Sequence, residues 1–183
     1  MRMFQEHLEC KQIDLGAHSG WMELYDVMED NQDTDVVVSL PSQIGIVIKE
    51  EGDELGSAVQ AMKRKMVIVW PINRAADSVY LLKLALEDIH GIDHALVLKN
   101  GFFGGTKQFY RWDHSNTKKD FIKKGYTEEF MPELHERITD KIGDAHLPYS
   151  IALTDGKFKI ADRMTMEKWI RNAHAVFTSL DDV

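Results

Sequence analysis

Cysteine is almost absent from this sequence, because Cys10 is the only one among 183 residues. A single thiol can form neither an intramolecular disulfide nor a cysteine-based metal cage, so the composition suits a reducing compartment. Long apolar runs are also missing, since no stretch approaches the roughly 20 residues that a membrane span needs. No signal-peptide pattern follows Met1. These features predict a soluble cytoplasmic protein with no membrane partner.

Basic residues are in the minority, with 22 Lys and Arg against 30 Asp and Glu and a formal net charge of -8. Such a chain does not attract nucleic acid through its overall field. Direct DNA binding is therefore not expected from the overall charge. A contact with DNA would be made by a partner or by a local basic patch such as Lys118, Lys119, Lys123 and Lys124. The composition is 44% hydrophobic and 28% charged, which is typical of a globular protein. The length predicts one domain, residues 1–183.

The run Asp35-Val-Val-Val-Ser-Leu-Pro-Ser-Gln43 is the stretch around which we expect the fold to be arranged. A short β-branched run that ends at a proline is typical of a strand buried on both faces of a parallel sheet. Ligands of such sheets bind beyond the carboxyl ends of the strands, so Ser39, Pro41 and Gln43 are candidate binding residues. An ordinary core strand with an ordinary turn is the alternative.

Alternating strands and amphipathic helices follow along the chain, which predicts βαβ units and a mainly parallel sheet. The fold class that we expect is a three-layer α/β/α domain. Residues 1–10 show no hydrophobic period, and we expect them to be disordered. Residues 151–160 are either a hairpin or a loop. The expected strands are 35–40, 66–70, 95–100 and 127–131, with a short edge strand at 11–15; the expected helices begin near Ser19, Leu55, Asp77, Ser115 and Pro132, and a final packing helix covers 163–180.

Motifs for metal binding and for nucleophilic catalysis are not supported. His90 and His94 are separated by Gly91 at an expected helix end, so they do not share a helical face. Gly101-Phe-Phe-Gly-Gly-Thr-Lys107 is too short for a phosphate-binding loop, and its Lys follows the Thr. Cys10 has no identifiable base. We therefore assign no catalytic residue and no metal ligand.

Aromatic side chains are concentrated in the stretch from Phe102 to Trp112. Glycines flank this stretch, and without regular structure its backbone groups cannot all be satisfied inside a core. We expect the aromatic loop to be partly exposed near the carboxyl edge of the sheet, as a surface for a partner or for the flank of a nucleotide. A hydrophobic clasp over the end of the sheet is the alternative.

Several short motifs together suggest a family. Between about residues 11 and 143 their order and spacing resemble ParA/MinD-like P-loop ATPases, in particular the plasmid mobilisation and stability branch. The motifs are Asp35-Val-Val-Val-Ser-Leu-Pro-Ser-Gln43, Val67-Ile-Val-Trp70, Arg74 to Leu82, Leu96-Val-Leu-Lys-Asn100, Phe109-Tyr-Arg-Trp-Asp-His-Ser115 and Phe130-Met-Pro-Glu-Leu134.

The resemblance implies a P-loop NTPase-like fold that binds ATP and Mg²⁺, but two expected features are missing here. The first strand and the Walker A loop with its Lys are not found, and Ser39 stands where the family has an Asp. Asn100 matches the position at which the family recognises adenine. The resemblance also implies a homodimer and, as partner, a relaxase or a DNA-binding partition protein.

Three interpretations of the function follow from these observations. The chain is the carboxyl-terminal part of a nucleotide-switch ATPase for plasmid partition or mobilisation, which is the interpretation we favour. Alternatively, it is a non-catalytic ParA-like interaction module. The third alternative is an unrelated doubly wound α/β enzyme, such as a flavodoxin-like protein. Because the phosphate loop and the carboxylate are both missing, we expect the chain by itself not to hydrolyse ATP.

Overall fold

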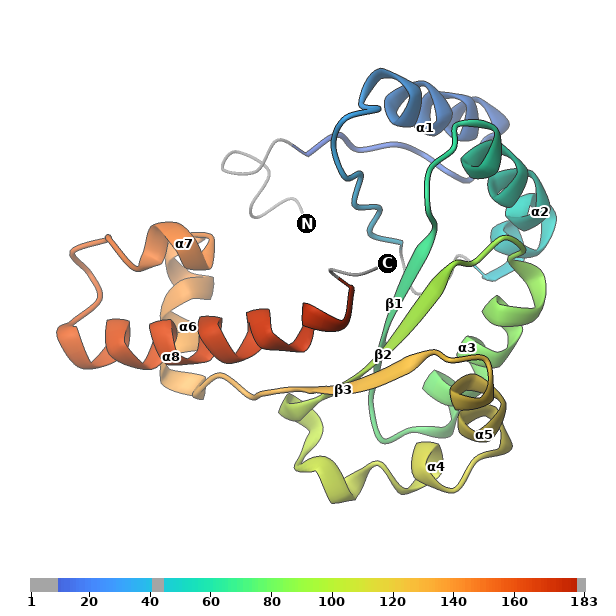
Figure 1. Ribbon diagram of the computed structural model, residues 1–183. Helices are drawn as coiled ribbons and strands as arrows, with labels where there is room; N and C mark the ends of the chain where they lie inside the picture. The colour runs from blue at the N-terminus through green and yellow to red at the C-terminus, as the bar shows by residue number, and fades with distance from the viewer. Residues whose placement is uncertain (1–9, 41–44, 181–183) are drawn as a thin grey trace.

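The computed structural model describes residues 10–40 and 45–180. Its centre is a parallel sheet of three strands in the order β1 (Val67–Ile72), β2 (His94–Asn100) and β3 (Thr127–Met131). The central strand β2 is buried along most of its length, because helices cover both of its faces. The strands near 66–70 and 95–100 were predicted from their apolar runs, and 127–131 was predicted as a short last strand. The structure confirms all three and pairs them in parallel (Figure 1).

One face of the sheet carries the main core. The helices α3 (Ala76–Asp88), α4 (Tyr110–Asp113) and α5 (Asn116–Lys123) pack on this face. The side chains at this interface are fully or nearly buried; they are Ile72, Val79, Leu82, Ala95, Val97, Phe109, Trp112 and Phe121. Helix α3 was predicted to be capped by Asp77, but its N-cap is Ala75 and Asp77 lies in the first turn, where an acidic side chain opposes the helix dipole.

The opposite face is covered by the end of the chain. Helix α8 (Ile160–Val176) and the 3₁₀ turn η4 (Thr178–Leu180) place Val176 against Leu96 and Leu98 of β2. The rest of α8 packs with α6 (Glu136–Ala145) and α7 (Tyr149–Ala152) in a separate cluster beyond β3 (Figure 1). The predicted final helix thus exists and packs on the sheet through its last turns. The segment 151–160 is not a hairpin. It contains the end of α7 and the loop that leads into α8, which was the alternative.

Two helices complete the fold next to β1. The apolar stripe predicted from Trp21, Leu24 and Met28 is buried in α1 (His18–Asp30) and contacts Val59 of α2 (Gly45–Ala61). Helix α2 also packs closely on the end of α3. A Cβ at its Gly52 would come within 2.3 Å of the Asp88 carbonyl oxygen. Helix α2 begins ten residues before the predicted position near Leu55, and α6 begins at Glu136 instead of Pro132.

The prediction of a buried central strand at 35–40 is wrong. These residues form no strand, and the side chain of Val37 is 92% exposed. A β-branched run becomes a buried strand only where other elements cover it. Of the described residues in this run, only Val36 is packed against a core cluster. The guanidinium of Arg64 instead holds the carbonyl oxygens of Asn31 and Thr34 just before this segment. Residues 11–15 also form no edge strand.

The α/β class with helices flanking a parallel sheet is confirmed, with a smaller sheet than expected. Strand β1 is an edge strand, and its Val67 and Val69 are partly exposed. None of the described helices is long and apolar enough to cross a bilayer. Of the predicted disordered start at 1–10, all but Cys10 lies outside the described residues.

Candidate functional site at the carboxyl edge of the sheet

The carboxyl ends of the three strands lie at the same edge of the sheet because the strands are parallel (Figure 1). Ligands of open α/β sheets bind at this edge, so it is the candidate site. Its loops begin after Ile72, Asn100 and Met131. Arg74, in the loop after β1, reaches across the edge and donates to Gln108 Oε1 at 3.5 Å.

Asn100 lies at the end of β2, as the sequence predicted. Its side-chain oxygen accepts a hydrogen bond from the Phe102 backbone N–H at 3.0 Å and thereby caps the 3₁₀ turn η2 (Gly101–Phe103). Gly101 follows in a tight position, since a Cβ there would lie 2.5 Å from the Met131 carbonyl oxygen. The Asn100 oxygen is thus committed to the loop, and a contact of its amide with a base stays a prediction.

The aromatic loop divides into a buried half and an exposed half. Phe109 and Trp112 are buried in the main core. Phe102 and Tyr110 are 71% and 67% exposed, and Phe103 is also exposed. The predicted partial exposure is confirmed, and the two buried rings at the same time form the hydrophobic clasp that was the alternative. The loop is anchored by one pair of rings and presents the other rings to solvent.

A network of four charged side chains connects the end of this loop to the sheet. Lys99 Nζ is 2.9 Å from Asp113 Oδ1 and 3.2 Å from Glu128 Oε1. Lys118 Nζ lies 3.0 Å and 2.7 Å from the same two oxygens. The indole N–H of Trp112 donates to the other oxygen of Glu128. Each lysine therefore contacts both carboxylates, and the network joins β2 and β3 to α4 and α5.

The network shifts the pKa values of three of its members. Burial by itself raises the pKa of Asp113, but hydrogen bonds from Lys99 and Lys118 outweigh it and hold that pKa below its usual value. Burial likewise raises the pKa of Glu128, and hydrogen bonds from Lys118 and Trp112 reverse the effect and lower it. Burial lowers the pKa of Lys118, whereas its hydrogen bonds to Glu128 and Asp113 produce a net increase. All three groups are thereby held in their charged forms.

Acid is expected to weaken the fold through this network below about pH 4. Because the pKa values of Asp113 and Glu128 are depressed, their stabilisation is complete above the unfolded values of about 3.9 and 4.3. It is lost as the pH falls through the lower, folded values. The raised pKa of Lys118 acts at the other end, because its stabilisation is complete below about pH 10.4 and is lost as the pH rises through the folded value.

Thermal unfolding followed by circular dichroism from about pH 6 to about pH 3 measures the acid effect. The double variant Asp113→Asn, Glu128→Gln lacks both carboxylates, so its Tm should fall less over this range than that of the wild type. The exposed pair Asp140→Asn, Glu167→Gln serves as a control with equal charge change. Parallel curves for the wild type and the network variant would contradict the expected contribution.

The remaining predicted binding residues are not brought to this edge by the described structure. Ser39 lies in exposed coil and does not end a strand, while Pro41 and Gln43 lie outside the described residues. His90 pairs with Asp53 in α2, and His94 Nε2 is 3.0 Å from Thr127 Oγ1. In residues 10–40 and 45–180, no group of three or more His, Cys, Asp or Glu side chains is arranged to hold a metal ion.

The described residues do not fit the phosphates and Mg²⁺ of the ATP that the ParA resemblance implies. A phosphate loop places backbone N–H groups and a Lys at the start of an α-helix. The stretch Gly101–Gly105 leads instead into η3 (Thr106–Gln108), a 3₁₀ turn of three residues. Lys99 is bound to two carboxylates. The edge can present an amide and aromatic rings, but among the described residues it lacks a cradle for phosphates.

The chain is similar to a curated protein. It is 28% identical over 175 residues to a protein named MobD from Acidithiobacillus ferrooxidans. The match covers 96% of this chain and 76% of that protein. No protein-family model matches the chain, and no solved structure is significantly similar to it.

Proposed function

We propose that this chain is a ParA-like plasmid mobilisation protein that works by binding and not by catalysis. The observation that carries the proposal is the similarity to MobD along 96% of the chain. The ParA-like order of motifs supports it, because three of these motifs form the parallel strands and the loops at their carboxyl ends.

The geometry of the candidate site favours binding over catalysis. Phosphoryl transfer depends on fixed positive charge at the phosphates and on a carboxylate that positions the metal ion. Within the described part of the chain, Lys99 and Lys118 neutralise Asp113 and Glu128 and are not directed at an empty site. Ser39 supplies no carboxylate, and its coil is exposed. The exposed rings of the aromatic loop are suited instead to contact with another molecule.

The resemblance adds a nucleotide, a dimer and a partner to the proposal. Asn100, at the end of β2, is the residue to test for contact with an adenine base, together with Ser39, Pro41 and Gln43. ATP and Mg²⁺ are implied by the resemblance alone. A homodimer and a relaxase or DNA-binding partition protein are the corresponding partners. The nucleotide-switch ATPase, of which this chain would be the carboxyl-terminal part, is the competing interpretation.

The purified chain is expected to release no phosphate from ATP above background in the presence of magnesium. Loss of a single element that stabilises the transition state commonly costs about 10²-fold in rate, and here both the lysine of the phosphate loop and the carboxylate are missing. A steady-state phosphate-release assay measures this directly. The variant Asn100→Ala and the control Asn116→Ala, on the exposed start of α5, accompany the wild type. Turnover that disappears in Asn100→Ala but persists in Asn116→Ala would favour the ATPase interpretation.

A further inference from the structure

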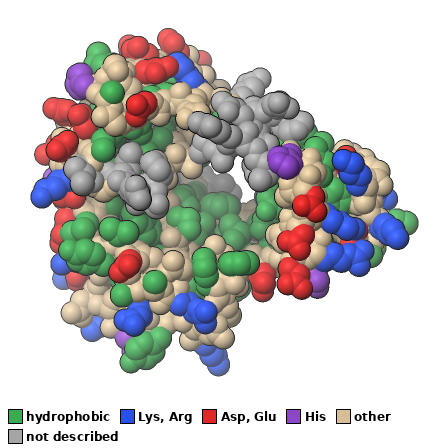
Figure 2. Space-filling view, turned by 180° about the vertical axis from the view of Figure 1, so that it is seen from behind, with side chains coloured by type: hydrophobic (Ala, Val, Ile, Leu, Met, Phe, Trp, Pro, Cys, Tyr) green, Lys and Arg blue, Asp and Glu red, His purple; other side chains and the backbone are tan. Residues whose placement is uncertain are grey.

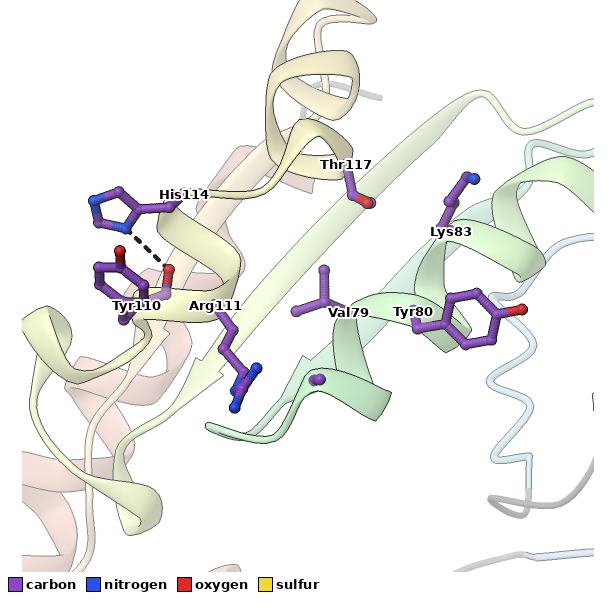
Figure 3. A pocket seen from close by; sticks show the side chains of 8 residues that line it. Val79, Tyr80, Lys83, Tyr110, Arg111, His114 and Thr117 are labelled. Carbon is purple, nitrogen blue, oxygen red and sulfur yellow. Dashed lines mark hydrogen bonds between the residues drawn. The ribbon is translucent and has the colours of Figure 1, made fainter.

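A groove lies on the outer side of the main core, between α3 on one side and α4 and α5 on the other. Its volume is about 490 Å³. Figure 3 shows Arg111 extending between the two sides of the groove, with Tyr110 and His114 on one side and Tyr80 and Lys83 on the other. The buried Val79 belongs to its lining. The groove is separate from the charged network, whose side chains take no part in it.

The groove is flanked by aromatic rings that are open to solvent. Tyr80 is 59% exposed and Tyr110 is 67% exposed. The rings of Tyr110 and His114 are stacked with their centroids 4.0 Å apart and their planes 26° from parallel. His114 Nδ1 lies 3.0 Å from the Tyr110 carbonyl oxygen, and this contact helps to fix the stack. One face of the stack and the Tyr80 ring therefore remain available to a planar ligand.

The groove is cationic on a molecule whose formal net charge is -8. In residues 10–40 and 45–180, no carboxylate lies within ion-pair distance of Arg111 or His114, and Lys83 has a single exposed contact of 3.6 Å with Glu87. Lys118, on the neighbouring helix α5, is by contrast held by two carboxylates. In the space-filling view, basic and hydrophobic side chains predominate at the lower end of the molecule, whereas acidic side chains gather toward the upper left (Figure 2).

We infer that this groove binds single-stranded nucleic acid, with bases stacked on Tyr80 and Tyr110 and the phosphate backbone next to Arg111 and Lys83. Exposed rings that alternate with cations are the standard combination for single strands, because every base offers a flat face for stacking. Paired bases in a duplex cannot reach the rings, and a few cations on an acidic chain do not hold a duplex by charge alone. An acidic peptide would use the cations and leave the rings unused. This inference does not depend on the proposed role in mobilisation.

Fluorescence anisotropy with the full 183-residue chain tests the inference. The probes are a labelled single strand of about 12 thymidines, which matches the site sizes of such proteins, and a duplex of the same length. We expect the single strand to bind more tightly than the duplex. Tyr110→Ala should weaken binding of the single strand by about 5-fold or more, because it removes one stacking platform. Arg111→Ala should reduce the slope of log K against log salt by about 0.7, the contribution of one phosphate contact.

Two variants on α8 serve as matched controls. Arg171→Ala removes an exposed arginine and Ile160→Ala removes an exposed apolar side chain, both far from the groove in sequence. Neither should change binding, and circular dichroism of every variant confirms that it is folded. Absence of binding to the single strand at low salt would overturn the inference. Equal affinity for the duplex or for a poly-glutamate peptide would also overturn it, as would a loss in the controls as large as that in Tyr110→Ala.

Discussion

Trp112→Ala is expected to lower the free energy of unfolding by about 3–5 kcal/mol, the usual cost of removing a buried aromatic side chain from a core. The indole is 1% exposed and lies at the centre of the main core, with its ring centroid 5.5 Å from that of Phe121. Its removal also leaves one oxygen of Glu128 without its donor. Because Trp112 fixes α4 on the sheet, its loss should loosen both the aromatic loop and the groove.

Urea unfolding followed by circular dichroism measures this effect. The variant Trp112→Phe separates its two parts, because phenylalanine keeps a ring in the core but cannot donate to Glu128, so its cost should be intermediate. Phe102→Ala is the matched control, since this ring belongs to the same loop but is mostly exposed. It should change stability by no more than about 0.5 kcal/mol. If Trp112→Ala cost no more than Phe102→Ala, the anchoring role of Trp112 would be wrong.

The strands and several helices could be predicted because their signals are local. The apolar runs that became β1 and β2 are bounded by turns or helices, and the stripe of Trp21, Leu24 and Met28 repeats with the period of a helix. The predicted strand at 35–40 failed for the opposite reason. Its three valines satisfy the local preference, but burial requires a neighbouring strand and covering helices, which no local pattern supplies.

The position of the candidate site could be predicted from the sequence, but the contacts among its side chains could not. The rule that ligands bind at strand ends placed Asn100 and the aromatic loop at the same edge. The charged network could not be predicted, because it depends on how β2, β3, α4 and α5 meet. Lys99 offered a signal, since it is a charged residue that continues an apolar strand and is only 9% exposed. A buried lysine requires a carboxylate partner, and here it has two.

Of the local basic patch suggested by Lys118, Lys119, Lys123 and Lys124, the last three lysines are exposed on α5 and at its end. Lys118 belongs to the charged network, and Lys119 donates to Asn116 on its own helix. Lys124 lies 6.0 Å from the centre of the Tyr126 ring. The cations of the groove come instead from α3 and α4, where the sequence shows them singly. The sequence alone therefore did not indicate the groove, because Lys83 and Arg111 are brought together only by the packing of α3 against α4.

Deletion of the gene from a mobilisable plasmid is expected to give the second large effect, because a mobilisation protein is needed for transfer and not for maintenance. The measurement is the number of transconjugants per donor, with a conjugative helper plasmid that supplies the mating apparatus. Transfer should fall sharply in the deletion strain, the intact gene should restore it in trans, and plasmid retention without selection should be unchanged. Trp112→Ala should fail to restore transfer, whereas Ile160→Ala, which removes an exposed apolar side chain on α8, should restore it and controls for expression. Transfer that is unchanged by the deletion, or plasmid loss with normal transfer, would contradict the proposed role in mobilisation.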